Sequence, residues 1–164
     1  MKRLLLLLLL VAGTTGGAYA QEVYTQIRQK AVVQRDDQFG SDVVRQIGHF
    51  KVNALDYMAM KMKEQMPDST ASFLDKQALA MNSYVSLYVQ TLIEMKAQPA
   101  NYQVKVMKLF IDASVSNPLF NDRDQELVMG YVADGNSLTR FSLDTDWQRA
   151  LLAVDSELKK MAKQ

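Results

Sequence analysis

The sequence predicts an all-α protein, a single compact bundle of five to six helices that follows an N-terminal signal peptide. Three observations support this fold class. Apolar residues recur every three or four positions over most of the chain, which is the period of an amphipathic helix. No stretch alternates polar and apolar residues for long enough to build a sheet. Helix-capping residues, prolines and glycines divide the apolar stripes at intervals typical of a helical bundle.

The first twenty residues, 1–20, are expected to be a secretory signal peptide rather than part of the fold. Two basic side chains precede the apolar run 4–12, and the segment ends with Ala18 and Ala20 at the A-x-A positions. Signal peptidase cleaves after this order of basic, apolar and small residues. A run of nine apolar residues is too short to span a bilayer, which takes about 20. We therefore predict cleavage before Gln21 and a periplasmic or secreted product.

The predicted mature chain, residues 21–164, is expected to be one helical domain of 144 residues. The full chain carries 19 basic and 18 acidic side chains, and loss of the two basic residues of the signal leaves 17 against 18, a net charge of −1. This even balance argues against nucleic-acid binding. The absence of Cys excludes disulfides, Cys-ligated zinc and thiol catalysis. No second apolar run is long enough for a transmembrane segment, so we expect the mature chain to be soluble.

Two helices are expected at the start of the mature chain. The first spans 22–35 and ends at a loop that contains Gly40. Ser41 is placed to cap the second helix, with Asp42 favourably located in its first turn. The second helix ends before Pro67, which cannot continue it. Its apolar stripe comprises Val44, Ile47, Ala54 or Leu55, Met58, Met62 and Met66.

The third and fourth helices are the most apolar. The third begins at Ser69 or Thr70 and ends in the segment 97–100. Its middle is apolar on nearly all sides, which predicts a central position in the fold. Asn101 is the predicted N-cap of the fourth helix, which ends before Pro118.

The last part of the chain is harder to divide. A short fifth helix is expected after an N-cap at Asn121 or Asp122. Residues 137–143 fit either a loop or an extended segment, because their apolar side chains alternate. Asp144 or Thr145 is the predicted N-cap of the final helix, which keeps helical spacing almost to the end of the chain.

A methionine series is the most unusual local feature. Met58, Met62 and Met66 lie on one face of the second predicted helix, four residues apart. Thioethers are soft ligands that suit monovalent copper, so the three residues are candidates for a metal site. Methionine side chains are also flexible, so the same residues could form a surface that adapts to a partner. The same three positions belong to the apolar stripe, however, and core packing is the favoured interpretation. No cofactor is predicted.

Three phenylalanines fall in predicted loops rather than on apolar stripes: Phe39, Phe120 and Phe141. An aromatic ring in a loop needs a pocket to fill or a partner to bind. Anchoring of the loops onto the bundle is the favoured interpretation. If the three rings gather at one exposed end, they form the first candidate for an interaction patch.

The polar residues show no recognisable catalytic pattern. His49 is the single histidine, and no nucleophile motif accompanies it, so we expect a surface or boundary position. The alternating acids Asp122, Asp124 and Glu126 lack the glycine that a calcium loop requires at its sixth position, and helix capping explains them better. Paired carboxylates brought together from distant positions stay open as a possibility.

These observations favour an exported, soluble, non-enzymatic helical protein that binds a protein or another envelope component. The alternative is a small periplasmic hydrolase whose site assembles from loop acids, or a methionine-rich protein that handles copper. A deep cleft with carboxylates that have no partner would favour chemistry, whereas paired polar groups and an exposed apolar surface would favour association.

Overall fold

The structure, a computed structural model, describes residues 22–124, 127–128 and 140–162. Its regular elements within these ranges are all helical, so the predicted all-α fold class is confirmed. The elements are α1 (Glu22–Asp36), α2 (Asp42–Gln65), α3 (Ala71–Glu94), the short 3-10 helix η1 (Met95–Ala97), α4 (Ala100–Val115) and α6 (Trp147–Met161). The predicted signal peptide and, between α4 and α6, residues 125–126 and 129–139 lie outside the described residues, including the first part of the ambiguous segment 137–143.

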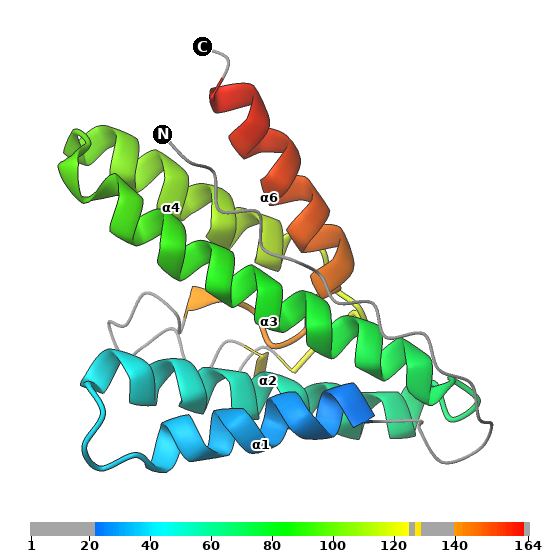
Figure 1. Ribbon diagram of the computed structural model, residues 1–164. Helices are drawn as coiled ribbons and strands as arrows, with labels where there is room; N and C mark the ends of the chain where they lie inside the picture. The colour runs from blue at the N-terminus through cyan, green and yellow to red at the C-terminus, as the bar shows by residue number, and fades with distance from the viewer. Residues whose placement is uncertain (1–21, 125–126, 129–139, 163–164) are drawn as a thin grey trace, which may run out of the picture.

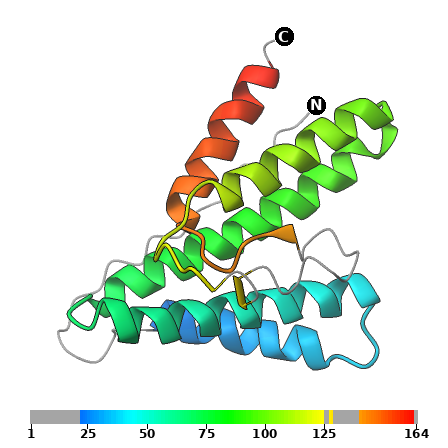
Figure 2. The same ribbon diagram turned by 180° about the vertical axis from the view of Figure 1, so that it is seen from behind.

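The helices form two antiparallel pairs. α1 and α2 lie side by side, and α3 crosses over them, as Figure 1 shows. α4 returns alongside α3, and α6 packs against both α3 and α4 (Figure 2). α3 therefore contacts each of the other four α-helices, which confirms the central position predicted for the third helix.

A glycine sets the close approach of the first pair. Gly48 is buried in α2, and a Cβ built there would lie 2.4 Å from the Arg35 backbone nitrogen and 2.7 Å from the Ala31 carbonyl oxygen of α1. Both distances are shorter than any Cβ contact. The two helix backbones consequently touch at this point, and Ala31 is itself only 1% exposed.

The core between the two pairs is aromatic. Tyr84 of α3 is fully buried and meets the rings of Phe110, Phe141 and Trp147 edge to face, with centroids 5.4–5.5 Å apart. Phe50 of α2 contacts the same Phe141 and Trp147 at 5.6 and 6.0 Å. Edge-to-face pairs contribute beyond the area they bury. The cluster therefore joins α2, α3, α4, α6 and the segment before α6.

The bounds of α1 and α2 agree with the prediction, whereas α4 does not start where predicted. Ser41 is the N-cap of α2, and its Oγ accepts a hydrogen bond from the Val44 N–H at 3.4 Å. α4 begins one residue before the predicted cap, because the Pro99 carbonyl already accepts the N–H groups of residues 102 and 103. Asn101 lies inside the first turn, where its side chain accepts the Tyr102 N–H.

Two further predicted caps are wrong, for one physical reason. The helical residues 127–128 are capped by Asp124, which accepts the Leu127 N–H on its side chain and the Val128 N–H on its carbonyl. The N-cap of α6 is Asp146, whose Oδ1 accepts the Arg149 N–H at 3.2 Å. The side chains predicted to cap these helices, those of Asp122 and Asp144, are engaged in tertiary contacts instead. The Thr145 hydroxyl is likewise buried, where it contacts the Ser114 hydroxyl and donates to the Ser142 carbonyl, rather than capping the helix.

Candidate functional site

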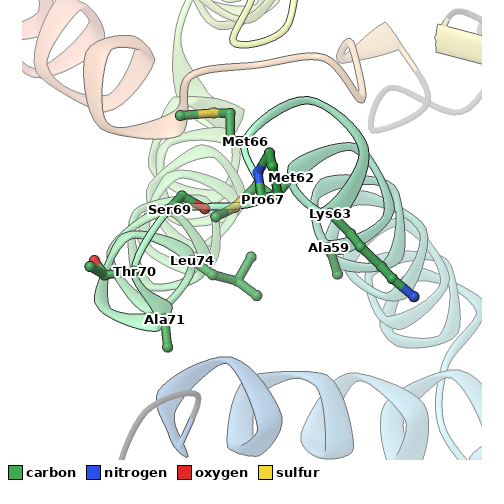
Figure 3. Close-up of a pocket in the computed structure, with 9 residues that line it drawn as sticks. All are labelled: Ala59, Met62, Lys63, Met66, Pro67, Ser69, Thr70, Ala71 and Leu74. Atoms are coloured by element: carbon green, nitrogen blue, oxygen red, sulfur yellow. The ribbon is translucent and has the colours of Figure 1, made fainter.

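The methionine series divides between the core and a pocket. Met58 is completely buried and lines neither of the two pockets described here. Met62 and Met66 line a pocket of about 380 Å³ at the turn between α2 and α3. Figure 3 shows side chains of α2 on one side of this pocket and side chains of α3 on the other. A thioether site here would have two methionine ligands rather than the three that the sequence suggests.

The remaining lining of the methionine pocket is small or apolar. It holds one cation, Lys63, and two hydroxyls, Ser69 and Thr70, beside Ala59, Pro67, Ala71 and Leu74. No carboxylate belongs to this lining. Among the described residues, no group of three or more His, Asp or Glu side chains is placed to hold a metal ion. The geometry offers a shallow apolar hollow rather than a polar reaction centre.

The three loop phenylalanines do not form one patch. Phe120 and Phe141 are 8% and 1% exposed, so they belong to the core and not to a surface. Phe141 packs against Phe50 and Tyr84, and Phe120 packs edge to face on Tyr57 at 6.1 Å. The proposed three-ring patch is therefore corrected: two rings anchor their loops onto the bundle, because an aromatic ring gains most from burial.

Phe39 alone is exposed, and its loop is held by hydrogen bonds. Its ring is 100% exposed, while its N–H donates to Asp37 Oδ1 at 3.0 Å. Arg45 of α2 reaches back and donates to the Gly40 carbonyl at 2.5 Å. A Cβ on Gly40 would lie 2.7 Å from Asp37 Oδ2, the end of a side chain that can move aside. Val43, 58% exposed, follows in the first turn of α2.

The acidic residues between α4 and α6 are engaged in the fold. Asp144 is 3% exposed, and its Oδ1 accepts the N–H groups of Leu119 at 2.9 Å and Phe120 at 2.8 Å. Its Oδ2 accepts the Asp122 N–H at 2.8 Å. Asn121 adopts a left-handed conformation with φ 53° between these donors, a conformation that asparagine tolerates well. This carboxylate therefore organises a loop.

Asp122 connects the same loop to α2. Its Oδ2 accepts hydrogen bonds from the Tyr57 hydroxyl at 2.8 Å and from Lys61 Nζ at 2.9 Å. The Lys61 ammonium, with the Asp124 N–H and the tyrosine hydroxyl, lowers the pKa of the Asp122 carboxyl. Burial and the bond to Asp122 raise the pKa of Tyr57. Near neutral pH the Tyr57 hydroxyl therefore stays protonated and the Asp122 carboxylate stays ionised. This arrangement suits a structural contact and not proton transfer.

His49 is exposed on α2, as predicted. Its Nδ1 lies 2.9 Å from Asn53 Nδ2, one helical turn further along. It lines neither of the two pockets described here.

A second pocket, of about 420 Å³, contains a buried cation. It lies between α1, α2 and α3 and is lined by Gln34, Ile47, Lys51, Val85, Ser86, Val89, Gln90, Ile93 and Glu94. Lys51 is 7% exposed, and its Nζ donates to Asn82 Oδ1 at 2.7 Å. No carboxylate of the described residues lies within 4.0 Å of this ammonium group. Burial alone lowers the pKa of Lys51.

The sequence carried a signal for this lysine. Lys51 falls one turn after Ile47 and one turn before Leu55, so it occupies the apolar stripe of α2. In the apolar stripe predicted from the sequence, position 51 is the point where an apolar residue is expected and a lysine is found. A charged side chain on a core-facing position needs a partner or a functional reason, because burial of an ammonium group is unfavourable.

Comparison of the chain with protein-family models, with curated proteins and with solved structures finds no match. Among the described helices, none combines the length and the apolar character needed to cross a membrane.

Proposed function

We propose that this chain is an exported, non-enzymatic binding domain whose α1–α2 loop inserts Phe39 into a protein partner. The observation that carries the proposal is the fully exposed ring of Phe39 on a loop fixed by hydrogen bonds. Exposed aromatic rings are common centres of protein interfaces. A loop that is already ordered loses little conformational entropy on binding, so such a ring supplies affinity efficiently.

The charges around the loop favour a protein over an anionic membrane. The loop and its flanks carry two basic and three acidic side chains, a net charge of −1, and comprise Arg35, Asp36, Asp37, Asp42 and Arg45. Arg35 pairs with Asp36, and Arg45 pairs with Asp42. Membrane-surface segments instead carry clustered basic residues. The partner that fits this loop offers an apolar pocket for one ring and a neutral or weakly basic rim.

The use of the acidic residues supports a binding role rather than hydrolysis. Asp144 and Asp122 are committed to backbone and side-chain donors of their own loop. The methionine pocket has no carboxylate in its lining, and the pocket at Lys51 has one, Glu94. A glycosidase would present two carboxylates across a cleft.

Export is the second part of the proposal. α1 begins at Glu22, directly after the predicted cleavage site, so removal of residues 1–20 would leave every described helix intact. Intact-mass measurement of the protein recovered from cells should give a chain that starts at Gln21. An Ala20→Arg variant should keep its leader, because a large cation does not fit the peptidase pocket. A full-length mass for the unmutated protein would contradict export.

Site-specific photo-crosslinking tests the binding role. Benzoylphenylalanine in place of Phe39 should trap a partner in the producing cells, whereas the same group in place of Leu152, 69% exposed on α6, should not. With the partner purified, Phe39→Ala should weaken its Kd about tenfold or more, as for an interface hot spot, and Leu152→Ala should leave it unchanged. Binding of Phe39→Ala at the unmutated affinity would refute the proposal.

A further inference from the structure

A buried cation without a carboxylate partner is the least explained feature of the described residues. Lys51 Nζ has three N–H donors, and Asn82 Oδ1 accepts one of them. The side chain lines a pocket, so its environment is neither bulk water nor a closed core. A buried ammonium group is stabilised best by an anion. The pocket therefore lacks, in the described protein residues, the charge that would complement it.

Four of the nine residues that line this pocket are apolar, and three of the four form a line along α3. Val85, Val89 and Ile93 are four residues apart, so they lie on one face of α3 and span about 12 Å along its axis. Ile47 lies one turn from Lys51 on the opposing helix α2. The volume of about 420 Å³ lies within the range of small-molecule sites, about 300–1,000 Å³.

The two charged residues of the lining are far apart, and its other polar residues, Gln34, Ser86 and Gln90, are neutral. Lys51 bonds to Asn82, whereas the one acidic lining residue, Glu94, lies twelve positions further along α3. Twelve helical residues correspond to about 18 Å along the axis. A negative group beside Lys51 would consequently be distant from Glu94, while an apolar tail could follow the valines toward the exposed Ile93 at 59%.

From this arrangement we propose that the pocket between α1, α2 and α3 binds a small monoanionic amphiphile, an alkyl carboxylate, with its head group on Lys51 and its chain along Val85, Val89 and Ile93. The carboxylate accepts the remaining N–H groups of Lys51, and the methylene groups displace water from the apolar wall. This site is separate from the Phe39 loop, so either proposal can fail alone.

Calorimetry with two probes of equal chain length tests the head-group assignment. Decanoate, below its micellar concentration, should bind the mature protein at least about tenfold more tightly than decanol. Lys51→Met keeps the length of the side chain and removes its charge, and it should abolish that preference while leaving decanol binding unchanged. Lys63→Met removes the same charge from the methionine pocket, and the preference should persist.

A second variant guards against loss of the fold at position 51. Val89→Trp fills the pocket from its half-buried wall and should abolish binding of both probes. Phe39→Ala should bind decanoate as the unmutated protein does, which separates this site from the proposed protein interface. Equal affinity for decanoate and decanol, unchanged decanoate binding by Lys51→Met, or absence of decanoate binding would each overturn the proposal.

Discussion

The side-chain amide of Gln77 connects the second turn of α3 to the start of α6 at Trp147. Gln77 Oε1 accepts the Trp147 N–H at 2.8 Å, and its Nε2 donates to Asp146 Oδ1 at 3.0 Å. Gln77 is 1% exposed, so both bonds form away from water. One neutral side chain thus satisfies a backbone donor in the first turn of α6 and fixes the carboxylate that caps the same helix.

Gln77→Leu should destabilise the fold through this connection. The substitution keeps an apolar side chain of similar size but leaves the buried Trp147 N–H without an acceptor, which costs about 2 kcal/mol. Urea unfolding monitored by circular dichroism should show a lower midpoint with an unchanged slope. Gln46→Leu, at an exposed position of α2, is the matched control and should stay close to the unmutated protein. Equal midpoints for the two variants would contradict the role of Gln77.

Asp144→Asn tests whether the carboxylate organises the loop after α4. An amide has one acceptor oxygen, so its NH₂ group must face at least one of the N–H groups that Asp144 now accepts. We expect a loss of about 2–3 kcal/mol, since hydrogen bonds to a charged group are replaced by a donor–donor contact. Asp155→Asn, which loses only an exposed pair with Lys159, should change stability by less than about 0.5 kcal/mol. Thermal unfolding of both variants decides the comparison.

Gly48→Ala should separate α1 from α2. The added methyl group would collide with the Arg35 nitrogen and the Ala31 carbonyl, which are backbone atoms and cannot rotate away. Overpacking of this kind costs about 1–3 kcal/mol, although alanine is the better helix former in isolation. Gln46→Ala, measured against Gln46→Gly at the same exposed position two residues earlier, gives the helix-propensity effect alone. Stabilisation by alanine over glycine at both positions in a melting experiment would show that the helices are not in contact at Gly48.

Lys51→Met should stabilise the protein without ligand at neutral pH, by about 1 kcal/mol, because it removes a buried charge. Burial lowers the pKa of Lys51 from its ordinary 10.5, so the folded chain binds this proton less tightly than the unfolded chain does. The penalty is full below the folded pKa and disappears as the pH rises toward 10.5. The stability gap between the variant and the unmutated protein should therefore narrow with rising pH. Lys63→Met, at an exposed position, removes a charge that is not buried and is the matched control.

Local sequence signals were sufficient for the first half of the fold. Helical spacing, the Ser41 cap and the Pro67 stop define α2, because each acts within a few residues of the chain. The apolar middle of α3 likewise implies its central position. These features depend on neighbours in sequence, so a single chain displays them.

The candidate sites depend on contacts that the sequence does not display. Aspartate is a common helix cap, yet the Asp144 carboxylate accepts hydrogen bonds from backbone N–H groups more than twenty residues away. The loop positions of Phe141 and Phe120 favour anchoring onto the bundle, but the sequence does not display the core that receives them. Lys51 was recognisable as an interruption of an apolar stripe, but the pocket beside it needs three helices to be placed together.

The aromatic core has a consequence for the order in which the chain can fold. Phe141 and Trp147, which complete the cluster around Tyr84, lie in the last quarter of the sequence. Tyr84 of α3 can pack on Phe110 of α4 before these two rings are made, whereas Phe50 of α2 waits for both of them until translation is almost finished. Contacts of such wide sequence separation form late and slowly. The nascent chain therefore exposes an unfinished aromatic surface, and truncation before residue 141 would leave that surface permanently open to chaperones and proteases.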